Sequence, residues 1–188
     1  MRFLSSNRTL CYHNFTATRF IGYLKLELKM IQSYFQKEKI GGFVAMAIGI
    51  VACAVGGAVL LKAGSPFYTG FCIPLVLIGF IQIMVGATVA RRSDLQSEDL
   101  NKLLTDSPAE FRSLESPCIA TVMQKFVVFK WVELAVIAVG LALVLLIKTD
   151  NFPRGLGAGL LVQGVIMLVF DFFAEKRGKE YSGFVRNQ

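Results

Sequence analysis

Two ionisable side chains, Lys130 and Glu133, interrupt the almost wholly apolar run FVVFKWVELAV at residues 126–136. A third, Asp171, lies near the end of another apolar run, residues 155–173. Charged groups are costly inside a bilayer, so such residues mark either a site for ions or protons or the level at which a helix leaves the membrane. Glu133, Asp171 and Lys130 are therefore the candidate ion or proton site of this chain.

Helix geometry places the two acids at a similar depth. Counted along a helix from Lys148, Glu133 lies ~22 Å away. Counted from Arg154, Asp171 lies ~25 Å away. Glu133 would then lie ~7 Å inside the inner face of a ~30 Å hydrocarbon core, with Asp171 close to the same level.

Two interpretations of these residues follow. In the first, Glu133 and Asp171 belong to a belt of ion pairs that anchors the helices at the interface. The cations that would neutralise them are Lys130, Lys176 and Arg177. In the second, the two carboxylates form a proton or cation site that opens towards the cytoplasm.

Other catalytic chemistry is missing from the sequence. His13 is the one histidine, and the chain has no serine-hydrolase, metalloprotease, phosphate-loop or dinucleotide-binding motif. The four cysteines show no paired spacing, which argues against a zinc site. We therefore expect no enzyme activity, no cofactor and no bound metal. Gln82 and Gln163 lie in apolar runs, where we expect their amides to hydrogen-bond between helices.

The elements that carry these residues are four apolar runs. The chain of 188 residues is 54% hydrophobic and 18% charged, with a mean hydropathy of +0.57, which indicates a bilayer as its solvent. Each run is long enough to cross ~30 Å of hydrocarbon as a helix; they are residues 40–61, 67–90, 126–147 and 155–173. We predict an all-α, polytopic membrane protein, a four-helix bundle built from two tandem helical hairpins.

The chain then divides into five parts. We expect a cytoplasmic N-terminal tail, a first transmembrane hairpin, a cytoplasmic amphipathic loop along the inner surface, a second hairpin and a basic cytoplasmic tail. Their bounds are 1–39, 40–90, 91–125, 126–173 and 174–188. The sequence leaves open whether Met1 or Met30 is the true start. If Met30 is the start, residues 1–29 would be upstream sequence.

Lysine and arginine set the orientation. Seventeen of the 20 lie in the two tails and around the central loop, and three lie in the short turns. Because basic residues stay in the cytoplasm, both termini and the central loop are predicted there. The net charge of +7 is thus explained by topology, and we expect no nucleic-acid partner.

The two hairpins resemble each other in sequence. Residues 67–81 align with residues 152–166 at an offset of 85, and beyond them Arg92 aligns with Arg177. The preceding helices match at an offset of 86. We interpret this as an internal repeat, with a pseudo-symmetry axis along the membrane normal.

Small residues form a ridge on the first apolar run. They recur every four residues, which puts them on one helix face where backbones can approach closely; they are Gly41, Ala45, Gly49, Cys53 and Gly57. The ridge predicts close packing within the monomer or the seam of a homodimer. The expected partners are the lipid bilayer and either a second copy or another membrane protein.

The segment FDFFAEKRGKEY after the last run, together with FVVFKWVEL, resembles uncharacterised small four-span bacterial inner-membrane proteins over residues 30–182. That resemblance implies a bacterial inner membrane and brings no activity or ligand. From the sequence we expect a non-catalytic scaffold or accessory subunit. The alternative is a small transporter or channel that uses the cytoplasm-facing carboxylate pair.

Overall fold

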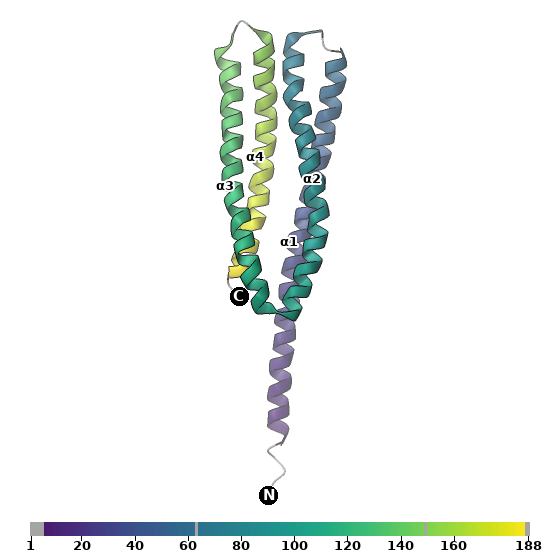
Figure 1. The fold of residues 1–188 in the computed structure, drawn as a ribbon, viewed down its shortest axis with the longest axis vertical. Coiled ribbons are helices and arrows are strands. Elements are labelled where there is room, and N and C mark those ends of the chain that lie inside the picture. Colours follow the sequence, from purple (N-terminus) through teal and green to yellow (C-terminus); the bar gives the residue numbers. More distant parts are fainter. Residues whose placement is uncertain (1–5, 63, 149, 187–188) are drawn as a thin grey trace.

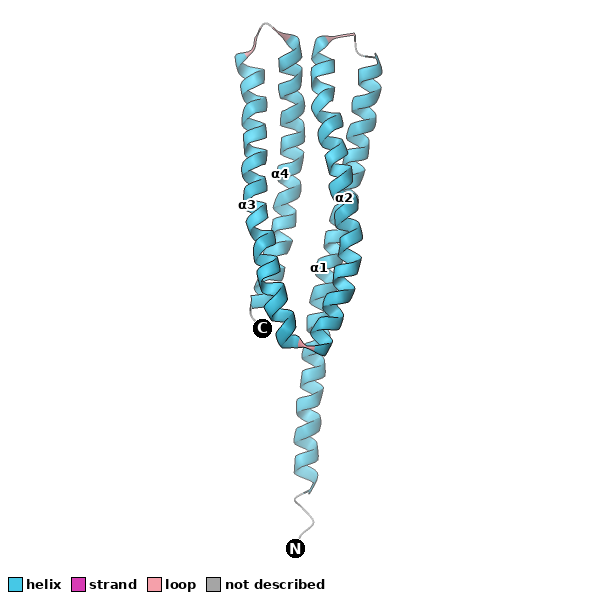
Figure 2. Ribbon diagram, in the orientation of Figure 1, coloured by secondary structure: helices cyan, strands magenta, loops and turns pink. Residues whose placement is uncertain are grey.

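A computed structural model describes residues 6–62, 64–148 and 150–186, with the side chains of the first helix described at Gly22 and from residue 24 onward. It consists of four helices, α1 (Ser6–Lys62), α2 (Pro66–Asp106), α3 (Pro108–Leu146) and α4 (Asn151–Arg186) (Figure 1). Every secondary-structure element in the described residues is helical (Figure 2). All four helices are long and apolar enough to cross a membrane. The predicted all-α bundle is confirmed, and it has the architecture of a multi-pass membrane protein.

The helices form two hairpins that stand side by side. In Figure 1, α1 pairs with α2 and α3 pairs with α4, and the main contact between hairpins is made by α2 and α4. The two short turns lie together at one end of the bundle, here called the turn end. The α2–α3 connection and the end of α4 lie at the opposite end, the tail end, beyond which α1 projects. The start of α1 and the end of α4 therefore lie on the same side of the bundle.

The helix boundaries follow local rules. Pro66 and Pro108 occupy the first helical positions of α2 and α3, where a missing N–H costs nothing. Ser107 alone separates α2 from α3; its N–H donates to the Leu103 carbonyl at 2.8 Å and its carbonyl accepts from Phe111 at 3.0 Å. The two long helices are thus joined by a one-residue corner.

The segment that we expected to lie along the inner surface, residues 91–125, instead runs on as part of two long helices. α2 continues to Asp106 and α3 starts at Pro108, and both follow the bundle axis (Figure 1). Likewise, the expected tails are helical where described, as parts of α1 and α4. The reason is a second hydrophobic core beyond the apolar runs, here called the tail-end core; its buried members are Ile31, Phe35, Leu104, Phe111, Ile119, Tyr181 and Val185.

Within each hairpin, small residues bring the helices together. On α1, Gly42, Gly49 and Gly56 recur every seven residues and each packs against the backbone or side chains of α2. Gly49 faces the carbonyl of Gly79, and Gly42 faces that of Gly86. In the second hairpin, Gly140 and Gly157 meet in the same way. A seven-residue spacing keeps one seam between two helices continuous.

The ridge predicted on α1 coincides with this seam only in part. Gly49 lies in the seam, whereas Gly41 packs against Arg177 and Phe170 of α4. A side chain at Gly57 would meet nothing within 4 Å among the described residues. Residues that recur every four positions shift gradually around the helix surface. The contact between α1 and α2 therefore uses residues seven positions apart.

Between the hairpins, α2 and α4 make reciprocal contacts. Gly70 faces the carbonyl of Phe152, and Gly155 faces the carbonyl of Phe67. Further along, Gln82 Nε2 donates to Gln163 Oε1 at 3.2 Å. Gln163 Nε2 donates in turn to the Leu75 carbonyl at 3.4 Å. The expected interhelical bonding of the two buried amides is confirmed.

Candidate functional site

Glu133 is the most deeply buried acid of the apolar half of the bundle. Its side chain is 3% exposed, and neither carboxylate oxygen has a hydrogen-bond partner among the described residues. Glu133 stands seven residues before Gly140, so it continues the α3–α4 seam towards the tail end. The seam thus places a carboxyl group where the other positions have glycine or apolar residues.

Asp171 on α4 lies beside Glu133. The two carboxyl groups are close enough to act directly on one another. Asp171 is only partly buried, because its other side faces a cavity between the hairpins. The structure therefore brings together the two acids that the depth estimate placed at one level. Asp171 lies between the buried Glu133 and the cavity.

The cations that we expected to neutralise these acids have other partners. Lys130 Nζ lies 2.6 Å from Glu175 Oε2, and Lys179 Nζ lies 2.9 Å from Glu175 Oε1. Arg177 Nε lies 3.3 Å from Glu38 Oε1. Glu175 is one helical turn further along α4 than Asp171, which matches the depth of Lys130, one turn before Glu133 on α3. The third expected cation, Lys176, is exposed.

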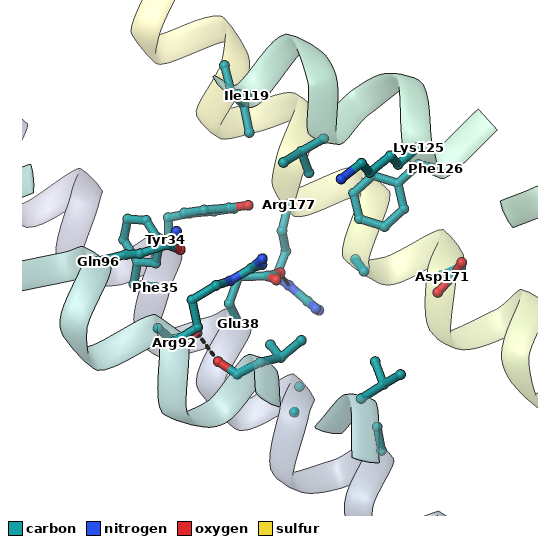
Figure 3. A pocket seen from close by; sticks show the side chains of 18 of the residues that line it. Tyr34, Phe35, Glu38, Arg92, Gln96, Ile119, Lys125, Phe126, Asp171 and Arg177 are labelled. Carbon is teal, nitrogen blue, oxygen red and sulfur yellow. Dashed lines mark hydrogen bonds and ion pairs between the residues drawn. The ribbon is translucent and has the colours of Figure 1, made fainter. Parts of the chain in front are cut away.

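The cavity itself was not predicted from the sequence. It has a volume of about 510 Å³ and lies between the hairpins in the half of the bundle nearer the tail end, with residues from all four helices in its wall (Figure 3). Seven of the lining residues are acidic or basic: Glu38, Arg92, Asp99, Glu115, Lys125, Asp171 and Arg177. A cavity of this size that combines a mostly apolar wall with a few charged groups is typical of small-molecule sites.

An arginine from each hairpin approaches Glu38. Figure 3 shows Glu38 of α1 between Arg92 of α2 and Arg177 of α4, and both guanidinium groups act on its carboxylate. The repeat had aligned Arg92 with Arg177, which was a usable signal for this pair. Glu38 gave no such signal, because it lies in a polar stretch whose packing depends on contacts with distant helices.

Towards the tail end, aromatic side chains close the cavity. The rings of Tyr34 and Tyr181 stack at 4.2 Å, and Phe35 packs edge-on against both. Glu115, which lies outside the apolar run of α3, is buried beside them, and burial raises the pKa of its carboxyl group. This floor belongs to the tail-end core, so the same packing that extends the helices also closes the cavity.

Part of the cavity wall is aromatic. Phe126 and Phe129 of α3 and Phe170 of α4 line the cavity, and Lys125 lies beside Phe126 (Figure 3). Neither a family model, nor a curated protein, nor a solved structure matches this chain.

Proposed function

We propose that this multi-pass membrane protein is a small transporter that binds a proton at Glu133 and Asp171 and exchanges it through the cavity. The observation that carries the proposal is Glu133, whose two buried carboxylate oxygens have no donor among the described residues. An ionisable residue in this setting is a functional-site candidate by default.

A proton shared by Glu133 and Asp171 would remove the electrostatic repulsion between their carboxylates. Two carboxylates side by side repel one another, and burial adds several kcal/mol to the cost of a charge that has no partner. Sharing one proton removes the repulsion and provides a hydrogen bond between the two groups, as in other carboxylate dyads. The belt of ion pairs keeps partial support, because the charge of Lys130 acts on both acids. The ion pairs themselves, however, join Lys130 to Glu175 and Arg177 to Glu38.

A scaffold or accessory role is the second candidate. The ridge on α1 favoured that role, since it offered a face for a second copy. Gly49 packs against α2 within the monomer, which removes part of this support. Gly57, with no neighbour within 4 Å among the described residues, is the ridge position that still favours an outside partner.

The proposed orientation puts the tail end on the cytoplasmic side of a bacterial inner membrane, so that the cavity lies in the cytoplasmic half of the protein. Support comes from the lysines and arginines, which concentrate in the segments that form the tail end. The protein would then take protons from, or release them to, the cytoplasmic side. Asp171 would be the first of the two acids to exchange.

The proposed internal repeat gains support from contacts. Gly70 and Gly155 exchange equivalent contacts across the α2–α4 interface, as a two-fold axis along the bundle requires at an offset of 85. For α1 and α3 the contacts favour an offset of 84 in place of 86, because Gly56 and Gly140 occupy equivalent places against Cys72 and Gly157. Such a repeat would let one hairpin rock against the other around the cavity.

Carbodiimide labelling tests the proton site. Dicyclohexylcarbodiimide adds to a protonated carboxyl group in apolar surroundings and gives a stable acylurea that peptide mass spectrometry can locate. We expect the label on Glu133 or Asp171 in the protein reconstituted in lipid. Labelling should decrease as the pH rises, because the proton that the reaction needs is lost.

The matched variants are Glu133→Gln with Asp171→Asn, and Glu98→Gln as the control. The double variant should lose the label, while the control, an exposed acid paired with Lys102, should keep it. Size-exclusion chromatography checks that each variant stays folded. Label spread over exposed acids, or none on the pair in a folded protein, would contradict the proposal.

A further inference from the structure

We infer that the cavity takes a monovalent organic cation with an apolar body, which replaces the proton at the Glu133–Asp171 pair. The inference rests on the proposed proton site and names the class of its substrate. It follows from the charges that meet at this level and from the side chains that line the cavity together with Asp171.

The local charges balance with one added positive charge. Glu133 and Asp171 lie together with Glu175, and Glu175 is held by Lys130 and Lys179. With every group ionised, three negative charges face two positive charges. One proton on the pair makes the group neutral, and one monovalent cation beside the pair does the same. Proton and cation therefore exclude each other, and each cation that binds releases one proton to water.

The cavity wall indicates an organic cation. Phe126, Phe129 and Phe170 line the same cavity as Asp171, and aromatic faces attract ammonium-like cations. Their surface also favours an apolar body over a hydrated ion. Two carboxyl groups alone are few ligands for a divalent metal, which prefers six or more oxygen atoms. The volume of about 510 Å³ suits a small molecule.

Three basic side chains line the cavity: Arg92, Lys125 and Arg177. Lys125 lies beside Phe126 (Figure 3). Arg177 is six residues beyond Asp171 on α4, which is ~9 Å nearer the tail end. Its charge is met by Glu38, towards which Arg92 also points (Figure 3). Asp171 forms no ion pair in the described part of the chain, so its carboxyl group, with Glu133 behind it, offers a place in the cavity for one added positive charge.

Binding of two ions of the same shape tests the inference. Tetraphenylphosphonium is a lipophilic cation, and tetraphenylborate is its anionic counterpart with nearly equal size and apolar surface. Equilibrium dialysis of the purified full chain in detergent would measure both across a pH series. We expect the cation to bind and the anion not to bind. The apparent Kd of the cation should fall about tenfold per pH unit wherever one proton competes for the site.

The variants separate this inference from the proposed function. Asp171→Asn should reduce cation affinity at least tenfold, and Glu98→Gln should leave it unchanged. Equal binding of tetraphenylborate, or cation binding that ignores both pH and Asp171→Asn, would overturn the inference. Should carbodiimide still label the pair in that case, the proton site stands and only the substrate class is wrong. Should the label be absent as well, both fail.

Discussion

At the scale of single residues, the buried amides and the buried carboxyl group in the apolar half of the bundle differ in their hydrogen bonding. Gln82 and Gln163 satisfy each other across the α2–α4 interface at 3.2 Å. Glu133 has no such donor among the described residues, and its neighbour Asp171 is a second acid. Amides can stabilise a contact between helices without a proton, whereas paired carboxyls call for one.

The amide pair gives a prediction of its own. Gln163→Leu should destabilise the bundle by about 1–3 kcal/mol, because it leaves the buried Gln82 amide without its acceptor. Adding Gln82→Leu should recover part of this loss, since the unpaired group is then gone. Unfolding of the single and double variants in mixed micelles, followed by circular dichroism, measures both. A double variant less stable than the sum of the single variants would contradict this account.

The sequence predicts the depth of the acids in the membrane, but it does not predict which charged side chains they meet. Glu133 and Asp171 were found from sequence because bilayer thickness and helical rise fix their depth. Their pairing with each other was one of the two interpretations, whereas the ion pair of Lys130 with Glu175 was not found. Lys130 forms its ion pair with Glu175 and not with Glu133. Which of the two it meets depends on how α3 and α4 are rotated about their axes, and depth alone does not determine that rotation.

At the scale of helices, glycine decides which faces meet. Gly42, Gly49 and Gly56 form a seam with a spacing of seven, so α1 and α2 stay in close contact along their length. The small residues that recur every four positions in the sequence correctly identified α1 as a closely packed helix, and they included Gly49. They could not select the face, because Gly41 and Gly42 are adjacent and each is used in a different contact.

A matched pair of substitutions on α1 tests this seam. Gly49→Ala puts a methyl group against the Gly79 carbonyl, which is backbone and cannot move aside, so we expect a loss of about 1–3 kcal/mol. Gly57→Ala meets nothing within 4 Å among the described residues and should leave stability unchanged or slightly raised. Thermal unfolding in detergent compares them. Equal effects would show that the seam lies elsewhere, and a loss confined to Gly57→Ala would indicate an outside partner.

At the scale of the whole molecule, the two hairpins and their common side could be predicted, since apolar length and short polar turns are local properties. The course of the helices beyond the apolar runs, along the bundle axis, could not, because it depends on contacts between residues far apart in the chain, such as Ile31 with the tail-end core. For the same reason the cavity was missed. It exists because the hairpins meet at Gly70 and Gly155 and again in the tail-end core, and it lies between these contacts.

The central claim is that Glu133 and Asp171 hold an exchangeable proton in the folded protein. Infrared difference spectra of the chain in lipid bilayers, recorded as the pH is raised, test it most directly. We predict a C=O band of a buried protonated carboxyl group that disappears reversibly at high pH and is lost or shifted in both Glu133→Gln and Asp171→Asn. A spectrum without this band, or a band that persists unchanged in both folded variants, would contradict the account.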